Sequence, residues 1–215
     1  MSNTSSQLDV EREEIDLPLP ELRGGLPLAE ALAHRRSRRE FAAGRPTPAQ
    51  VAQLCWAAQG ITEGEQGLRT APSAGATYPI ALFVVEPDGV YRYEPSGHRL
   101  RRLLTGDVRA RLQAAAEDQP CVGEARLCLV LAVEVGVVAA RYGRRRGWRY
   151  GLLEAGHVAQ NVLLQATALG LAGVPVGAFE DRQVAHDLGL RPGLHPVYLL
   201  PIGVPSARVP RGGAS

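Results

Sequence analysis

The sequence predicts an α+β fold in which helices and strands pack as layers around one hydrophobic core. One long stretch, Tyr150 to Leu171, repeats apolar residues at helical spacing, whereas a turn at Glu86–Gly89 separates two strand-like runs. Helices and hairpins alternate without a regular strand–helix–strand series, which favours a layered α+β arrangement over a parallel α/β sheet. The chain has 215 residues and is 45% hydrophobic, enough for one sizeable core.

Two helices are expected in the first third of the chain. Leu26 to His34 is expected to form a short helix. The next helix has clear start signals, because Thr47 suits the N-cap, Pro48 suits the first turn and Gln50 completes a capping box. Gly60 is expected to end this helix.

The predicted strands follow a loop over residues 60–72. Ala81 to Val85 and Val90 to Tyr93 are expected to form a hairpin. Leu127 to Val133 is a nearly unbroken apolar run, which is typical of a central strand. Pro196 to Ile202 is expected to be the last strand.

Three further helices are expected in the second half. Asp107 to Glu117 and Asp181 to Leu188 are predicted to be short, and Gly189 is expected to end the second of them. The longest helical pattern, Tyr150 to Leu171, is apolar nearly all round. A helix of this kind is expected to be buried, either in the middle of the core or in a dimer interface.

Composition excludes several classes of protein. All 24 basic residues are arginine, so the lysine of a Walker A phosphate loop and the Schiff-base lysine of a pyridoxal-phosphate enzyme are both missing. No GxGxxG motif supports a dinucleotide-binding Rossmann site. Cys55, Cys121 and Cys128 lack metal-ligand spacing; they are expected to be buried thiols, and no metal site is predicted.

Charge is unevenly distributed along the chain. Residues 1–25 carry six acidic and two basic groups, net −4, and are expected to form an acidic arm that is flexible or wraps a partner. The domain is expected to span 26–205, with a short tail at 206–215. No long apolar run and no signal-peptide pattern occur, which predicts a cytoplasmic protein without a membrane span.

The first segment that could carry chemistry is a basic cluster after the first helix. Its arginines offer charge-assisted donors, and its serine offers a neutral donor, for a phosphate group; these residues are Arg35, Arg36, Ser37 and Arg39. A solvated basic loop or a nucleic-acid patch is an equally open alternative. No aromatic residues are interleaved for base stacking, which weakens the nucleic-acid interpretation.

Two later segments could approach a flat ligand. Between Arg69 and Pro79, two prolines stiffen the chain and small residues permit a close backbone approach. Between Val174 and Asp181, small residues precede a helix start, where backbone N–H groups are free to bind an acceptor. An ordinary turn and a plain helix-to-strand connection are the respective alternatives.

The order of these segments resembles a known family. Arg35–Phe41 (RRSRREF) resembles the opening of FMN-dependent nitroreductases. Ala71–Pro79 (APSAGATYP), Tyr150–Gln165 and Gly170–Phe179 resemble segments of the azoline-dehydrogenase branch, which acts in thiazole and oxazole peptide biosynthesis. The resemblance runs from about residue 26 to 205. It implies a nitroreductase-like α+β fold with a central mixed, mainly antiparallel sheet flanked by helices, one of them long and buried.

The resemblance implies an FMN site, with NAD(P)H as a possible electron donor. The basic cluster and a C-terminal arginine would hold the phosphate and ribityl chain, and the two later segments would contact the flavin. These implied cofactor-binding residues are Arg35, Arg36, Ser37, Arg39, Pro72, Ser73, Ala74, Gly75, Pro175, Val176, Gly177, Ala178, Arg208 and Arg211. The N–H of Gly177 or Ala178 would lie near the reactive flavin N5.

The candidate catalytic residues are Arg141 and Tyr142. Active members of the azoline-dehydrogenase branch resemble one another in a Lys-Tyr pair at this place. An arginine stays charged and is a poor proton acceptor, so lysine-based proton abstraction is not expected. Glycines in the segment Arg141–Tyr150 permit movement and its aromatics suit a cover for the flavin. We expect the segment to line the substrate pocket, with simple packing of Tyr142 as the alternative.

Three functions remain open, of which a flavin oxidoreductase passing electrons from NAD(P)H to a nitro, quinone or similar small acceptor is favoured. An azoline dehydrogenase acting on a thiazoline or oxazoline peptide is the alternative. A nucleic-acid-binding module using Arg35–Arg39 and Arg141–Arg149 is least favoured. The long apolar helix, together with the dimeric assembly that the resemblance implies, predicts a homodimer with FMN at the interface. Glu154 and His157 have di-iron spacing without a second pair and are expected to be ordinary polar residues of a buried helix.

Overall fold

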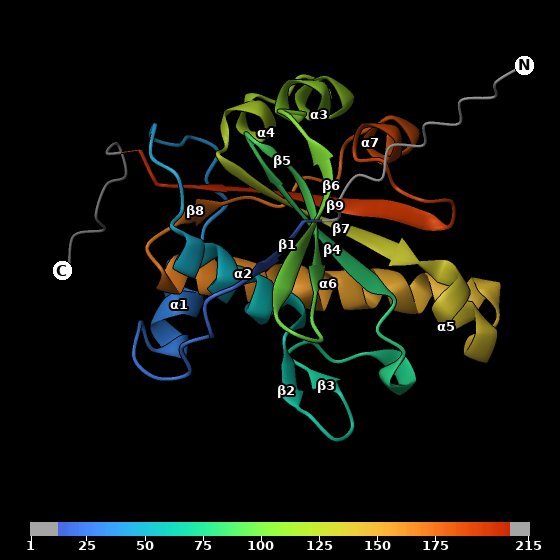
Figure 1. The fold of residues 1–215 in the computed structure, drawn as a ribbon. Helices are drawn as coiled ribbons and strands as arrows, with labels where there is room; N and C mark the ends of the chain where they lie inside the picture. The colour runs from blue at the N-terminus through green and yellow to red at the C-terminus, as the bar shows by residue number, and fades with distance from the viewer. Residues whose placement is uncertain (1–12, 207–215) are drawn as a thin grey trace, which may run out of the picture.

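The computed structural model describes residues 13–206, and a seven-stranded sheet forms its centre (Figure 1). In sheet order the strands are β1 (Glu14–Asp16), β6 (Arg99–Thr105), β5 (Gly89–Glu94), β4 (Ile80–Glu86), β7 (Leu127–Glu134), β9 (Leu194–Gly203) and β8 (Ala172–Gly173). Every pairing between neighbouring strands of this sheet is antiparallel, and an isolated parallel bridge joins Ser37 to Gly173. The predicted sheet type is therefore confirmed.

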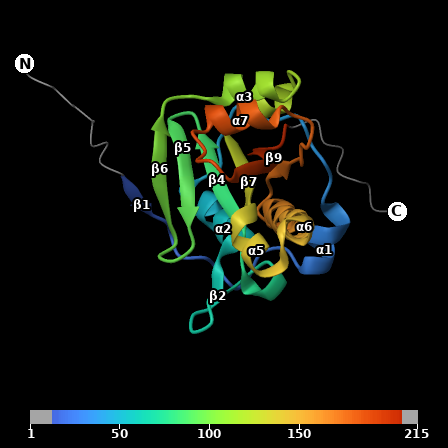
Figure 2. The same ribbon diagram turned by 90° about the vertical axis from the view of Figure 1, so that its right-hand side faces the viewer.

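Helices cover both faces of the sheet (Figures 1 and 2). Helices α1, α2 and α6 lie on one face, and α3, α4 and α7 lie on the other. Their bounds are α1 Leu28–His34, α2 Pro48–Gln59, α3 Arg109–Ala115, α4 Pro120–Glu124, α5 Val135–Tyr142, α6 Arg144–Ala168 and α7 Asp181–Asp187. A single 3-10 turn, η1, spans Ala74–Ala76, and a small hairpin of β2 (Ile61–Glu63) and β3 (Leu68–Arg69) lies within the predicted loop.

The position of β7 in the middle of the sheet explains why its sequence is apolar throughout. Leu129 and Leu131 pack into the core between the sheet and α2 and α6, whereas Cys128 and Val130 pack into the core beneath α3, α4 and α7. Successive strand residues point to opposite faces, so a strand covered on both sides needs apolar residues at every position. The prediction of a central strand at this place is confirmed.

Local start signals are also borne out in α2. The Thr47 hydroxyl accepts a hydrogen bond from the Gln50 N–H at 3.2 Å, and the Gln50 side-chain oxygen accepts one from the Thr47 N–H at 2.9 Å. Both donors belong to the first turn of the helix, which has no intrahelical acceptors for them. The predicted capping box is therefore formed.

Strands β6 and β1 were not predicted, because β6 does not alternate between apolar and polar residues and β1 is only three residues long. β6 carries three arginines, and it becomes a strand by pairing with β5 on one side and β1 on the other. Glu14 pairs with Arg99 at 2.7 Å and Glu13 with Arg102 at 2.8 Å. The described part of the acidic arm thus folds back onto a basic strand of its own sheet.

The segment Arg141–Tyr150, expected to be movable, is largely helical instead. α5 ends at Tyr142, Gly143 (φ 75°) makes the turn, and α6 begins at Arg144. Gly147 is buried so tightly against Val138 and Ala139 of α5 that a side chain there would be crowded. The two helices therefore form a packed hairpin, and the glycine serves close packing, not movement.

Helix α6 is buried along one face within the single chain. It starts at Arg144 and ends at Ala168, earlier at both ends than predicted. Ala155 and Val162 lie in the core, but Leu152 and Leu153 are 42% and 56% exposed. One face of the helix is therefore buried in the core as expected, and the exposed leucines leave the dimer-interface alternative for the rest of its surface.

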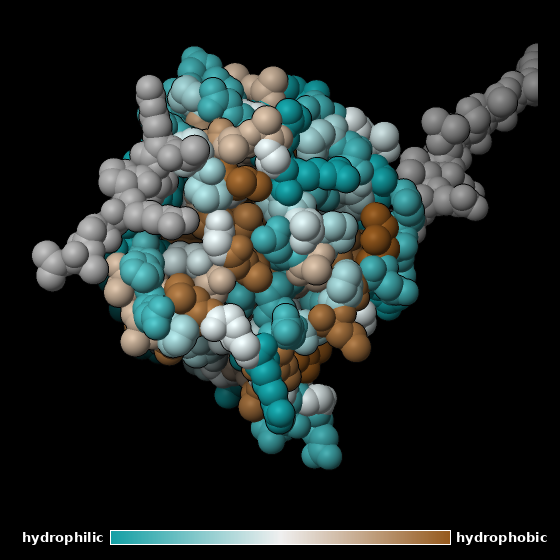
Figure 3. Space-filling model, turned by 90° about the vertical axis from the view of Figure 1, so that its left-hand side faces the viewer, coloured by the Kyte–Doolittle hydropathy of each residue, from teal (hydrophilic) through white to brown (hydrophobic). Residues whose placement is uncertain are grey.

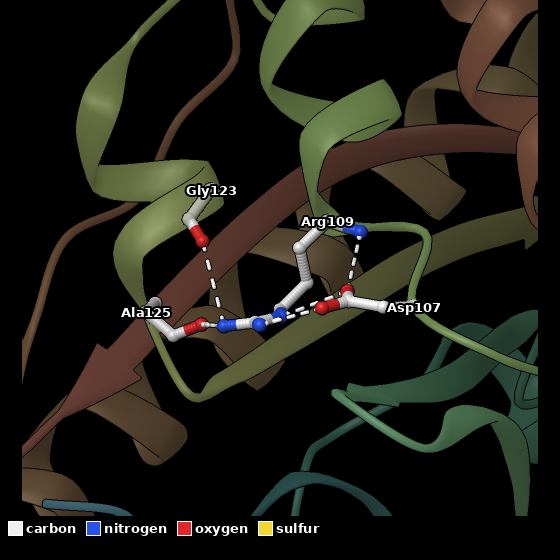
Figure 4. A network of polar contacts seen from close by, with 4 residues as sticks. All are labelled: Asp107, Arg109, Gly123 and Ala125. Carbon is white, nitrogen blue, oxygen red and sulfur yellow. Dashed lines mark hydrogen bonds and ion pairs between the residues drawn. The ribbon is translucent and has the colours of Figure 1, made fainter. Parts of the chain in front are cut away.

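Arg109 connects the start of α3 to the end of α4 (Figure 4). Its guanidinium donates to both carboxylate oxygens of Asp107 and, at 3.0 Å, to the carbonyl oxygen of Ala125. These hydrogen bonds lower the pKa of Asp107. The contacts of Arg109 hold α4 in place, and α4 contributes to the site described next.

Candidate functional site

The first and third sequence segments meet at the β8 edge of the sheet, called here the arginine edge (residues 35–39 and 173–178). The Arg38 N–H donates to the Gly173 carbonyl at 3.0 Å, beside the parallel bridge between Ser37 and Gly173. Further along, Val176 and Leu199 exchange backbone hydrogen bonds of 2.8 and 3.0 Å. The basic cluster therefore lies next to the start of the small-residue segment, as a shared binding site requires.

The arginines of this edge have different roles. The Arg36 guanidinium donates to the carbonyl oxygens of Ala33 and Arg35, which closes the C-terminal end of α1. Within residues 13–206, neither Arg35 nor Arg39 has a carboxylate within ion-pair distance. Burial raises the pKa of Cys121 in α4, and the positive charge of Arg39 opposes this shift, so Arg39 lies close to α4.

Backbone donors are also available at this edge. The N–H groups of Val174 and Val176 are used in bonds to β9, and Pro175 has none. Gly177 and Ala178 are exposed, and in the described part of the chain their N–H groups have no acceptor. The Gln119 side chain of α4 donates to the Ala178 carbonyl at 3.2 Å, which orients this peptide. The edge thus combines unpaired guanidinium groups with free N–H donors, a donor set that fits a phosphate ester carrying a flat, hydrogen-bonding ring system.

The second segment meets Arg141 and Tyr142 elsewhere, at a place called here the Gly75 corner (Ser73–Tyr78 with Arg141 and Tyr142). The Arg141 guanidinium donates to the Gly75 carbonyl at 3.1 Å. A methyl group at Gly75 would collide with the Tyr142 hydroxyl and with the Arg141 guanidinium. Tyr142 also packs edge-on against Tyr150, with ring centres 5.1 Å apart. The structure therefore joins two segments that are more than 60 residues apart in sequence.

The loop of the Gly75 corner has an unfavourable backbone. Gly75, Ala76 and Tyr78 have φ values of 57°, 52° and 46°, in the left-handed region. For residues with a side chain this conformation costs about 1–2 kcal/mol each. The Tyr78 N–H donates to the Ser73 hydroxyl oxygen at 2.8 Å, which closes the loop on itself. Such conformations persist where the surroundings hold them, and they concentrate at functional sites.

A buried polar network lies beneath this loop, and sequence reasoning missed it. Arg69 places its guanidinium over the Tyr78 ring, 4.6 Å from the ring centre, and donates to the Gln59 side-chain oxygen at 2.8 Å. The Gln59 side chain donates in turn to the Glu154 carboxylate at 3.4 Å. Burial lowers the pKa of Arg69, and the charge of Glu154 opposes that shift. The spacing of apolar residues had placed Glu154 on a buried helix but gave no signal of its partners.

Glu154 is itself almost fully enclosed, at 2% exposed. Burial raises the pKa of its carboxyl, while the nearby Ser73 hydroxyl, the Gln59 side chain and the charge of Arg69 oppose this shift. His157, one turn further on, is exposed and does not share this environment. In the described residues no group of three His, Cys, Asp or Glu side chains is placed to hold a metal ion.

One chain does not bring Pro72–Gly75 to the arginine edge. Gly173 of the edge lies against Leu163 of α6, whereas Ser73 faces Glu154 on the same helix. These two helix positions are nine residues apart, roughly 13 Å along the axis at 1.5 Å per residue. Arg208 and Arg211, the C-terminal phosphate candidates, lie outside the described residues. Tyr142 and Arg141 belong to the Gly75 corner, so the predicted site residues fall into two groups.

The fold is that of a layered α+β protein with a basic sheet edge, the arginine edge. The profile of the nitroreductase family matches residues 32–204, and the chain belongs to this family. A nitroreductase-family protein of Methanocaldococcus jannaschii, MJ1384, is 38% identical over 89% of this chain and 97% of its own length. The Microcin B17-processing protein McbC of Escherichia coli is 28% identical over 57% of this chain and 48% of its own length.

Solved structures agree with this membership. A nitroreductase-family crystal structure from Ralstonia eutropha superimposes with a TM-score of 0.83 at 31% identity, covering 90% of both chains. The Escherichia coli microcin synthetase McbBCD complex contains a chain that matches with a TM-score of 0.69 at 21% identity, over 96% of this chain and 85% of that one. At that identity the second likeness concerns the fold alone. No helix in residues 13–206 has the length and apolar character needed to cross a membrane.

Proposed function

We propose that this chain is an FMN-dependent oxidoreductase that transfers two electrons from NAD(P)H to a nitro, quinone or similar small acceptor. The observation that carries the proposal is the donor set of the arginine edge. Arg35 and Arg39 have no carboxylate within ion-pair distance in residues 13–206, and the same sheet edge carries the N–H groups of Gly177 and Ala178, which have no backbone acceptor there. The basic cluster suits the single terminal phosphate of FMN. Bound FMN supplies reversible two-electron redox chemistry.

Each part of the edge then has a specific task. Arg35, Ser37 and Arg39 bind the phosphate and ribityl chain, and Arg36 keeps the end of α1 in place for them. The N–H of Gly177 or Ala178 donates to the flavin ring and thereby tunes its electronics. A neighbour of the same fold is named as an NADPH:FMN oxidoreductase, from Vibrio harveyi (TM-score 0.64, 22% identity), which agrees with the proposed cofactor and donor.

The proposed active form is a homodimer with a flavin at each of two equivalent interface sites. In a dimer, Ser73 and Gly75 of one chain can approach the arginine edge of the other, which they do not reach within one chain. Apolar side chains are exposed on the face over α1 and β8 (Figure 3), and Leu28 and Leu32 of α1 are 66% and 52% exposed. With Leu152 and Leu153 of α6 they supply apolar surface for a partner copy.

The dimer is tested by light scattering of the purified protein at low micromolar concentration. A mass of about twice 23.0 kDa is expected. A stable monomer that retains flavin would contradict the shared site and require both groups of residues to be reassigned.

The cofactor is tested by denaturing the purified protein and identifying the released chromophore by chromatography. FMN is expected, either bound on purification or after reconstitution. Release of FAD, or no flavin binding after reconstitution, would overturn the proposed function. A colourless protein that instead binds nucleic acid with strong salt dependence would favour the basic binding module.

A second candidate function is an azoline dehydrogenase acting on a thiazoline or oxazoline peptide. It is supported by the 28% identity to McbC, which is named for the processing of microcin B17. The Arg141 side chain weakens it, because a guanidinium stays protonated and donates to the Gly75 carbonyl. Turnover of a quinone or nitroaromatic with NAD(P)H, without aromatisation of a thiazoline peptide, is expected of the wild type. Efficient aromatisation would reverse the ranking.

A further inference from the structure

The buried Glu154 carboxyl has no role in the cofactor site proposed above. It lies in the first half of α6 with 2% of its surface exposed, and one of its oxygens, Oε2, has no partner in hydrogen-bonding geometry. Enclosing a carboxylate in a core is costly unless a charge and hydrogen bonds compensate it. A leucine would fill the same kind of position without that cost, so the carboxyl needs another reason to be there.

Its surroundings lead from α6 to the strained loop by two routes. The short route is the Ser73 hydroxyl, which faces the carboxyl and also accepts the Tyr78 N–H. The long route runs through Gln59 to Arg69, which lies over the Tyr78 ring. Both routes end on the same loop, so a single buried carboxyl ties together its first and last residues.

The loop needs such an anchor. Three of its residues hold left-handed φ values, two of them with side chains, and its outer side is held by the Arg141 bond to Gly75. On its inner side, the Arg69 N–H also donates to the Tyr78 hydroxyl at 3.1 Å. Without these inner contacts, a loop with this backbone would relax to lower-energy conformations. Its bonding residues would then no longer be held in one geometry.

We propose that Glu154 is a positioning residue, whose carboxylate holds the strained Ser73–Tyr78 loop in the geometry that the loop needs to contact the flavin. The inference rests on the proposed function and extends it to a residue that touches no cofactor itself. Among the described residues, the charged group that acts on Glu154 is Arg69 of β3, and the titratable Tyr78 of the loop and Tyr93 of β5 act in turn on Arg69. The carboxylate is retained in the core because the conformation of the loop depends on it.

The test compares wild type with Glu154→Gln, which keeps the size of the side chain but cannot carry charge. Because the buried charge is removed, the urea midpoint at pH 7 is expected to stay the same or rise. FMN affinity, measured by quenching of FMN fluorescence, is expected to fall about tenfold, the scale of one lost charged hydrogen bond. Hydrogen exchange at the amides of Ala76 and Tyr78 is expected to accelerate in the flavin-free protein. A purely structural role predicts the opposite pattern, lost stability with unchanged affinity per folded molecule.

Two further variants complete the design. His157→Gln alters an exposed position on the same helix and is expected to leave affinity and exchange unchanged. Ser73→Ala removes the short route together with the acceptor of the Tyr78 N–H, and it is expected both to lower FMN affinity and to accelerate exchange at Tyr78. If Glu154→Gln binds FMN as tightly as wild type and its loop amides exchange at the same rate, the inference is wrong. If wild type itself binds no FMN, the proposed function fails, while the exchange experiment still decides whether Glu154 holds the loop.

Discussion

The arginine edge and the Gly75 corner hold their binding segments in contrasting ways. At the edge, backbone bonds from Arg38 and Val176 hold the chain, and the guanidinium groups of Arg35 and Arg39 remain without carboxylate partners in the described structure. At the corner, the side chains of Arg141 and Ser73 hold a strained loop. The comparison teaches that free donors mark where a ligand is bound, whereas strain held by buried polar groups marks where geometry is set in advance.

The largest effect is expected at the arginine edge, where the ligand supplies the missing partner. Arg35→Ala combined with Arg39→Ala removes two charged donors, each worth about 1.5–3 kcal/mol. FMN affinity is therefore expected to fall by a factor of about 100 or more. Fluorescence titration measures the affinity, and circular dichroism should report an unchanged fold. Arg182→Ala, an exposed arginine on α7, is the matched control and should bind as wild type does.

The Gly75 corner is expected to respond in stability, since its contacts are already made within the protein. Gly75→Ala places a methyl group against Tyr142 and Arg141 at a φ of 57°. A loss of about 1–3 kcal/mol in the free energy of unfolding is expected, measured by urea denaturation. Gly136→Ala in α5, where a methyl group meets nothing within 4 Å, is the control and should gain about 0.5–1 kcal/mol. Equal effects at both glycines would show that the corner is not tightly packed.

The pH dependence of the free energy of unfolding should show that the Glu154 carboxyl, beneath the Gly75 corner, is buried. Burial raises the pKa of Glu154 in the folded chain, so the folded state binds this proton more tightly than the unfolded state does. The stability that this group contributes is complete below its unfolded pKa of about 4.3 and is lost as pH rises through the folded pKa. Wild type is therefore expected to lose stability relative to Glu154→Gln as pH increases from about 4.3, measured by urea midpoints at several pH values. A difference that does not vary with pH would mean that the carboxyl is solvated.

The smallest effect is expected at the start of α6, next to the corner. Its first turn contains no acidic residue and begins with three arginines, which the positive end of the helix dipole disfavours. Arg144→Glu is expected to stabilise the protein by about 0.3–1 kcal/mol at low salt and by less at high salt. Thermal denaturation at two ionic strengths measures this. Gln160→Glu, exposed near the middle of the same helix, should show little change.

Local signals predicted the parts of the fold that depend on neighbouring residues. The capping box of α2, the β4–β5 hairpin and the central strand β7 were all recognisable from short sequence patterns. Strand β6 was not predicted from the sequence, because a strand with three arginines is stabilised only by its pairing with β5 and with the acidic arm. The first turns of α6 were not predicted to be helical, because Gly143 and Gly147 suggested flexibility. Close packing against α5 explains Gly147 instead.

By itself, the sequence determined the family, the presence of a basic cluster and the small-residue segments, because these are properties of residue type and order. Only the tertiary structure decided that the predicted site residues form two groups next to different parts of α6, since the distance between them along that helix is not encoded in any short motif. It also decided the partners of Glu154. A carboxyl on a buried helix face acquires a role through the side chains that meet it, and Arg69, Gln59 and Ser73 come together there only when the sheet and α6 have packed.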